Sequence, residues 1–252
     1  MQRDSVGKIL FVAVALFLGC AVIVSVASVG LRSYQERNKE LDLKRNVLLA
    51  TGDLKQGEKI ASAQVEELFA KLTPKLVELG TGKFVDASPE EVSSFNAIEA
   101  AKKPETGVAI PQGKDIAGIK RRAKLARIYV TADGRYILPI YGKGLWSTMF
   151  AYIALASDDQ HTINGLVYYQ HGETPGLGGE VDNPLWRGQF VGKKVFDEKG
   201  KYRLHVLKGS GNNLDAYSAD GMSGATITTR GVDDMLEYWL GPEAFGPLLT
   251  SS

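Results

Sequence analysis

The chain has 252 residues, of which 44% are hydrophobic, so it is long enough for one or two domains with a packed core. Its 30 basic and 29 acidic side chains give a formal net charge of +1, which excludes the basic footprint typical of nucleic-acid binding. One cysteine excludes an intramolecular disulfide and a cysteine-ligated iron–sulfur cluster, and three histidines without ligand spacing predict no metal site.

The first predicted element is an uncharged stretch over residues 9–31, which follows a short tail over residues 1–8. A helix of this length is long enough to cross a hydrocarbon core of about 30 Å. A cleaved signal peptide is the alternative, because Ser25, Val26 and Ala27 place small residues where a peptidase would cut. The full length of the stretch favours a retained transmembrane anchor.

Basic residues flank the anchor on both sides and leave its orientation open. Arg3 and Lys8 precede it, whereas five basic residues follow it within a short distance. A simple count puts the C-terminal side in the cytoplasm, but a long domain can be translocated despite such charges.

Residues 32–105 are predicted to form a helical segment that packs on or beside the main domain. Ser62 is a candidate helix cap, and Thr73-Pro74 predicts the start of a further helix. Ser88-Pro89-Glu90-Glu91 fits a capping box that opens a helix to about Lys102, and a linker follows.

Residues 106–252 are predicted to form the main domain. Beyond Ala123 the apolar residues alternate, and the turn at Asp133-Gly134 indicates a hairpin. Further strands are expected over 149–155 and 163–169, with another pair flanking a turn at 197–200. Apolar residues at helical spacing then mark a final helix, which ends at Gly241-Pro242. The expected fold class is α+β, with a twisted, largely antiparallel sheet and flanking helices.

Two glycine-containing loops are candidate ligand-binding segments. In the first, Gly144 allows close backbone approach, while Leu145 and Trp146 offer an apolar wall for a ring. Taken alone, the spacing of this loop favours the alternative, a strand entry with a core tryptophan.

The second loop carries Glu173, Thr174, Gly176 and Leu177 around a Pro-Gly turn. Glu173 and Thr174 have groups that can hydrogen-bond a polar ring edge, and Leu177 can touch its face. A hairpin connection without a ligand is the alternative for this loop, and His171 beside it is expected to be an ordinary packed or exposed histidine.

A third loop places Thr226 after two residues with almost no side chain and directly before the final helix. The helix start offers unpaired N–H groups and the positive end of a dipole, which suit a phosphate. A common helix-capping run is the alternative. The residues expected at this site are Asp220, Ser223, Gly224, Ala225, Thr226 and Thr228.

The order of the three motifs resembles the FMN-binding domain family. The motifs are Gly-Leu-Trp at 144–146, Glu-Thr-Pro-Gly-Leu-Gly at 173–178 and Ser-Gly-Ala-Thr at 223–226, the last within an Asp-x-x-Ser-Gly-Ala-Thr flavinylation motif. Two membrane redox complexes share this domain, the Na⁺-translocating NADH:quinone reductase in its C subunit and the Rnf electron-transport complex in its G subunit. The anchor, the chain length and the long segment before Trp146 favour the first of these two families.

The resemblance implies that Thr226 carries FMN through a phosphoester bond formed by a flavin transferase. It implies a subunit that relays single electrons during NADH oxidation, quinone reduction and Na⁺ export, and that is not catalytic alone. It also implies an inner-membrane location with the domain on the periplasmic side. The expected partners are other subunits of the complex, including a second membrane flavin subunit and iron–sulfur-bearing neighbours.

Two alternatives stay open from the sequence. One is the Rnf-type subunit, which couples ferredoxin and NAD. The other is an anchored binding or scaffolding domain without flavin, in which the glycine loops are only turns.

Overall fold

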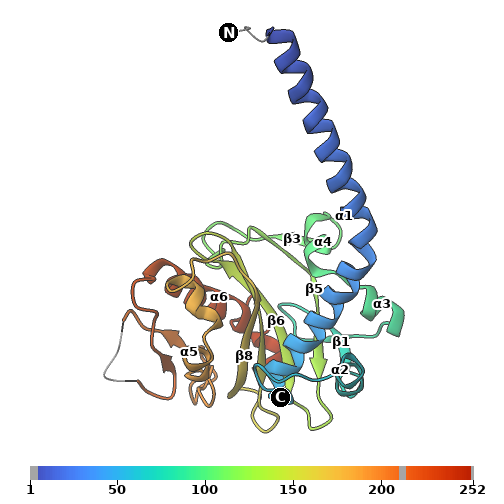
Figure 1. Ribbon diagram of the computed structural model, residues 1–252. Helices are drawn as coiled ribbons and strands as arrows, with labels where there is room; N and C mark the ends of the chain where they lie inside the picture. Colours follow the sequence, from blue (N-terminus) through green and yellow to red (C-terminus); the bar gives the residue numbers. More distant parts are fainter. Residues whose placement is uncertain (1–4, 210–213, 251–252) are drawn as a thin grey trace. The chain divides into compact units, whose positions relative to one another are not determined.

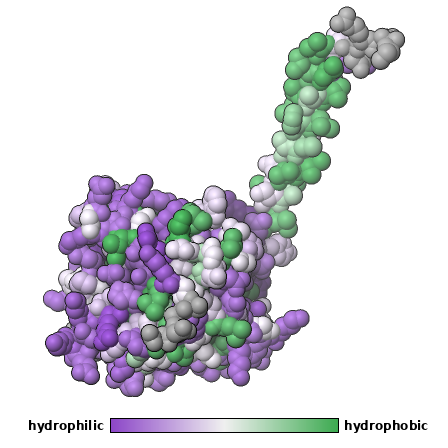
Figure 2. Space-filling view, turned by 90° about the vertical axis from the view of Figure 1, so that its left-hand side faces the viewer, coloured by the Kyte–Doolittle hydropathy of each residue, from purple (hydrophilic) through white to green (hydrophobic). Residues whose placement is uncertain are grey.

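The computed structural model describes residues 5–209 and 214–250 and divides them into two units (Figure 1). Residues up to Leu43 form one unit, and residues from Lys44 onward form the other. The first unit belongs to helix α1 (Val6–Thr51), whose large apolar side chains are exposed, and Figure 2 shows them on the side of the helix that faces the viewer. This helix is long and apolar enough to cross a membrane, which agrees with the predicted anchor.

The second unit holds the remaining elements. Its further helices are α2 (Ser62–Phe69), α3 (Pro89–Ser94), α4 (Ala97–Lys102), η1 (Gly178–Asp182, a 3-10 turn), α5 (Pro184–Gly188), α6 (Thr226–Leu240) and α7 (Gly246–Thr250). Its strands are β1 (Thr73–Glu78), β2 (Phe84–Val85), β3 (Gly107–Ala109), β4 (Arg121–Ala123), β5 (Leu125–Val130), β6 (Tyr136–Lys143), β7 (Thr148–Leu155), β8 (Ile163–Gln170), β9 (His205–Val206) and β10 (Ser218–Ala219).

The main sheet has the strand order β2-β1-β5-β6-β7-β8, and its neighbours are antiparallel throughout. The hairpin expected at Asp133-Gly134 joins β5 to β6, where Tyr129 pairs with Ile137. Two small sheets, β3-β4 and β9-β10, complete the described strands. The α+β prediction is therefore confirmed.

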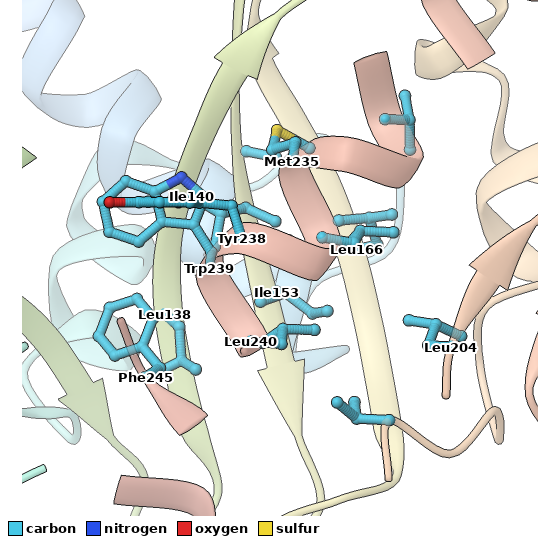
Figure 3. Packing of buried hydrophobic residues seen from close by; sticks show 14 of the residues in the cluster. Leu138, Ile140, Ile153, Leu166, Leu204, Met235, Tyr238, Trp239, Leu240 and Phe245 are labelled. Atoms are coloured by element: carbon cyan, nitrogen blue, oxygen red, sulfur yellow. The ribbon is translucent and has the colours of Figure 1, made fainter. Parts of the chain in front are cut away.

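Alternation along the strands gives the main sheet two buried faces, because successive side chains point to opposite sides. On one face, Leu138 and Ile140 of β6 and Ile153 of β7 lie against α6, as Figure 3 shows. The indole Nε1–H of Trp239 donates a 2.6 Å hydrogen bond to the carbonyl of Tyr141, which fixes α6 along β6.

The opposite face is covered by the last turns of α1 and by α2. Val47 and Leu48 of α1 are fully buried, and the ring of Phe69 meets that of Tyr129 edge-on at 5.2 Å. A Cβ on Gly165 of β8 would lie only 2.2 Å from the carbonyl oxygen of Ala50, so the helix backbone rests directly on the strand. Together the two helical layers enclose the sheet.

The helix predicted to begin at Thr73-Pro74 is wrong, because these residues begin strand β1. This strand pairs along its length with β5, with Leu76 opposite Arg127. Residues 73–85 therefore supply two strands of the main sheet and do not form a separate helical layer. The apolar residues at 76, 77 and 79 fit a strand as well as a helix, and the partner strand decides between them.

The helix predicted from Ser88 to Lys102 is interrupted. The capping box exists as expected, since Ser88 Oγ accepts from the Glu91 amide and the Glu91 carboxylate accepts from the Ser88 amide. The helix then stops, and Asn96 caps a second helix by accepting from the amides of Ile98 and Glu99. Asparagine is favoured at such a cap because its side chain satisfies helix-start donors.

Candidate functional site

The three predicted loops converge at the N-terminal end of α6. The first, residues 144–147, joins β6 to β7; the second, residues 171–178, follows β8; and the third, residues 220–225, leads into α6. They are separated by up to about 80 residues along the chain, so only the sheet and α6 bring them together. Contacts between the three loops join them into a single site.

The carboxylate of Glu173 is the centre of this junction. Its Oε1 accepts hydrogen bonds from the amides of Trp146, at 3.0 Å, and Ser147, at 3.1 Å. Its Oε2 accepts from the amide of Leu145, at 3.1 Å, and from the Thr228 hydroxyl, at 2.6 Å. One side chain thus ties the second loop to the first loop and to the first turn of α6.

The charge of Glu173 is stabilised within the junction. Burial of the carboxylate raises its pKa, but hydrogen bonds from Thr228 and from three backbone amides act in the opposite direction and outweigh it. The pKa of Glu173 therefore lies below its usual value. Four donors that point at one ionised group favour its charged form, as they would for any buried carboxylate.

Two glycines make room for this carboxylate. A Cβ on Gly144 would lie 2.6 Å from Glu173 Oε1, and a Cβ on Gly178 would lie 2.5 Å from Thr228 Oγ1. Real Cβ atoms do not approach so closely, so a side chain at either position would push the junction apart. Gly144 and Gly178 are therefore needed for close packing inside the protein, and not only to keep side chains away from a ligand at its surface.

The third loop is anchored on one side and open on the other. Met222 and Ala225 are buried in the core, whereas Ser223, Gly224 and Thr226 are exposed. Gly224 has a φ of +72°, a left-handed conformation that side chains other than glycine rarely adopt. The hydroxyl-bearing residues Ser223 and Thr226 are therefore both on the outside of the protein.

Helix α6 starts at Thr226 without a side-chain cap. Its N-cap residue is Ala225, whose methyl group accepts no hydrogen bond, and the first turn carries no acidic residue. The leading amides of the helix therefore keep their donors for another acceptor, and the positive end of the helix dipole adds to this preference. A phosphate ester on Thr226 would lie at this end.

Thr228 and Thr229 face inward and hold the start of α6. Thr228 is 1% exposed and gives its hydroxyl to Glu173, so its contact with a phosphate stays a prediction. The Thr229 hydroxyl accepts a 3.0 Å hydrogen bond from the amide of Met222. Both threonines thus fix the loop on which Thr226 stands.

Large apolar side chains are exposed around this junction. Trp146 is 67% exposed and Ile227 is 59% exposed, and Leu145 and Leu177 are nearly half exposed. Leu177 lies against Gly224, because a Cβ there would be 3.1 Å from Leu177 Cδ2. The alternative of a core tryptophan at position 146 is therefore wrong, and the loops present an apolar surface beside Thr226.

The remaining predicted residues act mainly through their backbones. The carbonyl of Thr174 accepts from the amides of Leu177 and Gly179, which closes the turn that holds Gly176. Asp220 receives the indole N–H of Trp186 on its carbonyl at 2.8 Å. Whether the Thr174 and Asp220 side chains meet a ligand stays a prediction.

His171 is half buried and has a structural role. Its Nδ1 accepts from the amide of Glu173 at 3.2 Å, so its Nε2 carries the proton and donates to Asp182 at 2.8 Å. The expectation that His171 is an ordinary packed histidine agrees with this geometry. Among the described residues, no group of three or more acidic, histidine or cysteine side chains is placed to hold a metal ion.

Sequence reasoning missed the residues that hold the loops together. Glu173 was expected at the edge of a bound ring, but its oxygens are taken by the protein. Ser147 ends the first loop and was given no role, yet its hydroxyl accepts a 2.6 Å hydrogen bond from the amide of Gly172. The glycines that flank these residues were the available signal, because each marks a place where another group approaches closely.

Known proteins resemble this chain in its site and over nearly its whole length. Residues 144–241 match the FMN-binding domain family, and this range includes all three loops. The chain is 42% identical over 254 residues to the C subunit of the Na(+)-translocating NADH-quinone reductase of Yersinia pestis, covering 98% of this chain and 93% of that protein. It is 43% identical over 253 residues to the protein of the same name from Vibrio vulnificus strain YJ016, covering 98% and 96%.

Solved structures agree with the sequence relatives. The crystal structure of Shewanella oneidensis NqrC superposes with a TM-score of 0.74 at 40% identity, covering 85% of this chain and 98% of that one. The crystal structure of the Na(+)-translocating NADH-quinone reductase C subunit from Parabacteroides distasonis gives a TM-score of 0.66 at 28% identity, covering 88% and 98%. The likeness thus extends well beyond the three loops to most of the chain.

Proposed function

The chain belongs to the family of the C subunit of the Na(+)-translocating NADH-quinone reductase, and we propose that it carries FMN covalently on Thr226. As a member of this family it is a flavin-bearing electron relay within an NADH:quinone reductase, and it acts as one subunit of that complex. The covalent bond would be a phosphoester between the FMN phosphate and Thr226 Oγ.

The observation that carries this proposal is the exposed hydroxyl of Thr226 on an uncapped helix start. Ala225 provides no capping acceptor, and Gly224 provides no side chain that would cover the hydroxyl. A flavin transferase must reach Thr226 Oγ from outside, and this loop leaves it accessible. A phosphate there would accept hydrogen bonds from the leading amides of α6, as phosphates do at helix N-termini.

The residues beside Thr226 would also suit the flat ring system of FMN. Trp146, Leu145 and Leu177 are large apolar side chains exposed beside the threonine, and they would cover the faces of a flat ring system. Glu173 would keep these side chains in place, because it binds the backbone of the first loop and the side chain of Thr228. When bound, FMN supplies the one-electron redox chemistry, and the protein supplies position and electrostatics.

The location is part of the proposal. The apolar part of α1 would hold the chain in the inner membrane as a single-pass anchor, and the second unit would lie on the periplasmic side. A domain outside the cytoplasm has little access to fresh FMN, so a permanent bond would protect it against loss of the cofactor. Other subunits of the complex would supply and receive the electrons.

The test is mass spectrometry of the full chain purified from its native membranes, with in-gel fluorescence after denaturation. We expect an FMN adduct on the peptide that contains Thr226. Thr226→Leu and Thr226→Ala should both lose the adduct and the fluorescence, whereas Thr226→Ser, which keeps a hydroxyl, is expected to retain part of both. An adduct that persists in the Thr226→Leu chain would place the attachment site elsewhere.

A further inference from the structure

A pocket with a volume of about 240 Å³ lies away from the three loops. It is open to the surface and is lined by the last turn of α1, the loop that follows it, strand β8, helix α5 and the residues just after it. Apolar walls come from Leu49, Leu54 and Val191, and polar side chains come from Gln56, Arg187 and Asn164, whose amide N–H donates to the carbonyl of Thr51. Arg187 is the only ionisable residue in the described lining.

The guanidinium of Arg187 is buried and incompletely paired. The residue is 8% exposed, and a guanidinium has five N–H donors. One nitrogen donates to the side-chain oxygen of Gln56, and another makes a long 3.5 Å contact to the carbonyl of Leu166. The buried Nε–H has no acceptor among the described residues. Most of the donor capacity of Arg187 is therefore unused.

No carboxylate of the described chain pairs directly with Arg187. Asp182 is the acidic residue whose charge acts on it, but Asp182 makes its 2.8 Å contact with His171. Burial lowers the pKa of Arg187, and Asp182 offsets only part of this. A buried cation without a close counter-ion is costly, since the protein replaces little of the hydration that the cation has lost.

We propose that this cavity binds a carboxylate group that pairs with Arg187. The planar fork of a guanidinium matches the two oxygens of a carboxylate. Gln56 turns its oxygen to Arg187, which leaves its amide N–H groups as further donors. The apolar residues around them favour a carboxylate on a short hydrocarbon stem, such as a small organic acid or a glutamate side chain of a partner subunit.

The probe is sodium butyrate, with butyramide as a neutral molecule of the same shape and sodium chloride as an ionic-strength control. The full-length protein in detergent is heated while its unfolding is followed. Butyrate should raise Tm by about 2–4 °C at concentrations about tenfold above its dissociation constant, and the two controls should not. An equal rise with butyramide would overturn the proposal.

Two variants locate the effect. Arg187→Met should fold, because an apolar residue of similar length often replaces a buried charge without loss of stability, and it should not respond to butyrate. Val191→Phe would fill the cavity from an exposed position and leave Arg187 in place, and it should also lose the response. A full butyrate response in Val191→Phe or in folded Arg187→Met would contradict the assignment.

The assembled complex distinguishes the two sources of the carboxylate. If a partner's side chain fills the cavity, the complex should be insensitive to butyrate, and Arg187→Met should weaken retention of this subunit during purification. If the natural ligand is a free organic acid, the intact complex should respond as the isolated chain does. Covalent flavin content should stay unchanged in both variants, so this proposal and that for Thr226 fail or succeed separately.

Discussion

The Thr228 hydroxyl donates a 2.6 Å hydrogen bond to the carboxylate of Glu173, and it does so across 55 residues of sequence. The same carboxylate holds the backbone of the first loop, so the position of Trp146 and the position of Thr226 depend on one side chain. The site is thus organised by the protein itself before any cofactor is attached.

Replacement of Glu173 by Gln should loosen all three loops. Glutamine keeps the shape but places an N–H₂ group where an oxygen now accepts hydrogen bonds. We expect a loss of about 1–3 kcal/mol in the free energy of unfolding, and a lower fraction of flavinylated chain. Denaturant unfolding and in-gel flavin fluorescence measure the two effects. The exposed Glu198→Gln is the control, and an equal loss in that variant would contradict a special role for Glu173.

The stability supplied by Glu173 should depend on pH in a defined direction. Its pKa is lower in the folded chain than in the unfolded chain, so the unfolded chain binds more protons in the window between the two values. The contribution is complete above the unfolded-state pKa of about 4.3 and is lost as the pH falls through the folded-state pKa. The difference in unfolding free energy between the native chain and Glu173→Gln should therefore shrink on acidification below about pH 4.3. A difference that stays constant there would contradict this account.

Gly178→Ala should damage the junction by overpacking. Its Cβ would lie 2.5 Å from Thr228 Oγ1, so either the loop or the helix must move. We expect a loss of about 1–3 kcal/mol in denaturant unfolding, together with reduced flavin attachment. Gly188→Ala is the matched control in helix α5, because nothing lies within 4 Å of its Cβ, and it should be neutral or slightly stabilising.

Gly224→Ala should lower the fraction of flavinylated chain, whereas its loss of stability should be similar to that of a control glycine variant. The left-handed φ costs about 1–2 kcal/mol for alanine, and the new methyl group would press on Leu177 at 3.1 Å. Gly192→Ala has the same kind of backbone cost, with a φ of +81°, but open space around its Cβ. Both variants should lose similar stability by thermal unfolding, and only Gly224→Ala should lose flavin. Equal flavin contents would show that the contact with Leu177 has no part in attachment.

The side of the membrane can be tested with a single introduced thiol. Cys20 is the only cysteine and lies within the apolar part of α1, so Cys20→Ser combined with Leu185→Cys provides one thiol on the 85% exposed position of α5. A membrane-impermeant maleimide should label it in cells whose outer membrane alone has been opened. Labelling only after the inner membrane is broken would put the domain in the cytoplasm.

Local sequence patterns were sufficient to predict those strands whose apolar residues alternate clearly and whose partner strand is the next one along the chain. Strands β5 and β6 alternate clearly and are joined at Asp133-Gly134, so the hairpin follows from neighbouring residues. Strand β1 was missed because its partner β5 lies about 50 residues later, and the short apolar run at Leu76 has no period long enough to exclude a helix. Residues that depend on a distant partner for their conformation are the ones that sequence reasoning placed wrongly.

The same limit applies to the site. Thr226 was singled out by the small residues before it and the helix after it, all adjacent in the chain, and the resemblance of this short motif to the FMN-binding domain family made it the predicted attachment site. The role of Glu173 was not predictable in this way, because its donors are backbone amides and a hydroxyl contributed by two other segments. Backbone donors have no sequence signature, and only the glycines around them hinted at the close contacts.

The missing cap of α6 has a consequence for how the protein matures. A helix with Ala225 as its N-cap lacks a stabilisation of about 1 kcal/mol that a serine or aspartate would give at that position. A phosphoester on Thr226 would bring an anion to these same amides, so the modification would complete the helix while it attaches the cofactor. If Thr226 is the attachment site, the unmodified chain would be less stable than the mature one, and this difference would give the cell a physical means of telling precursor from mature subunit.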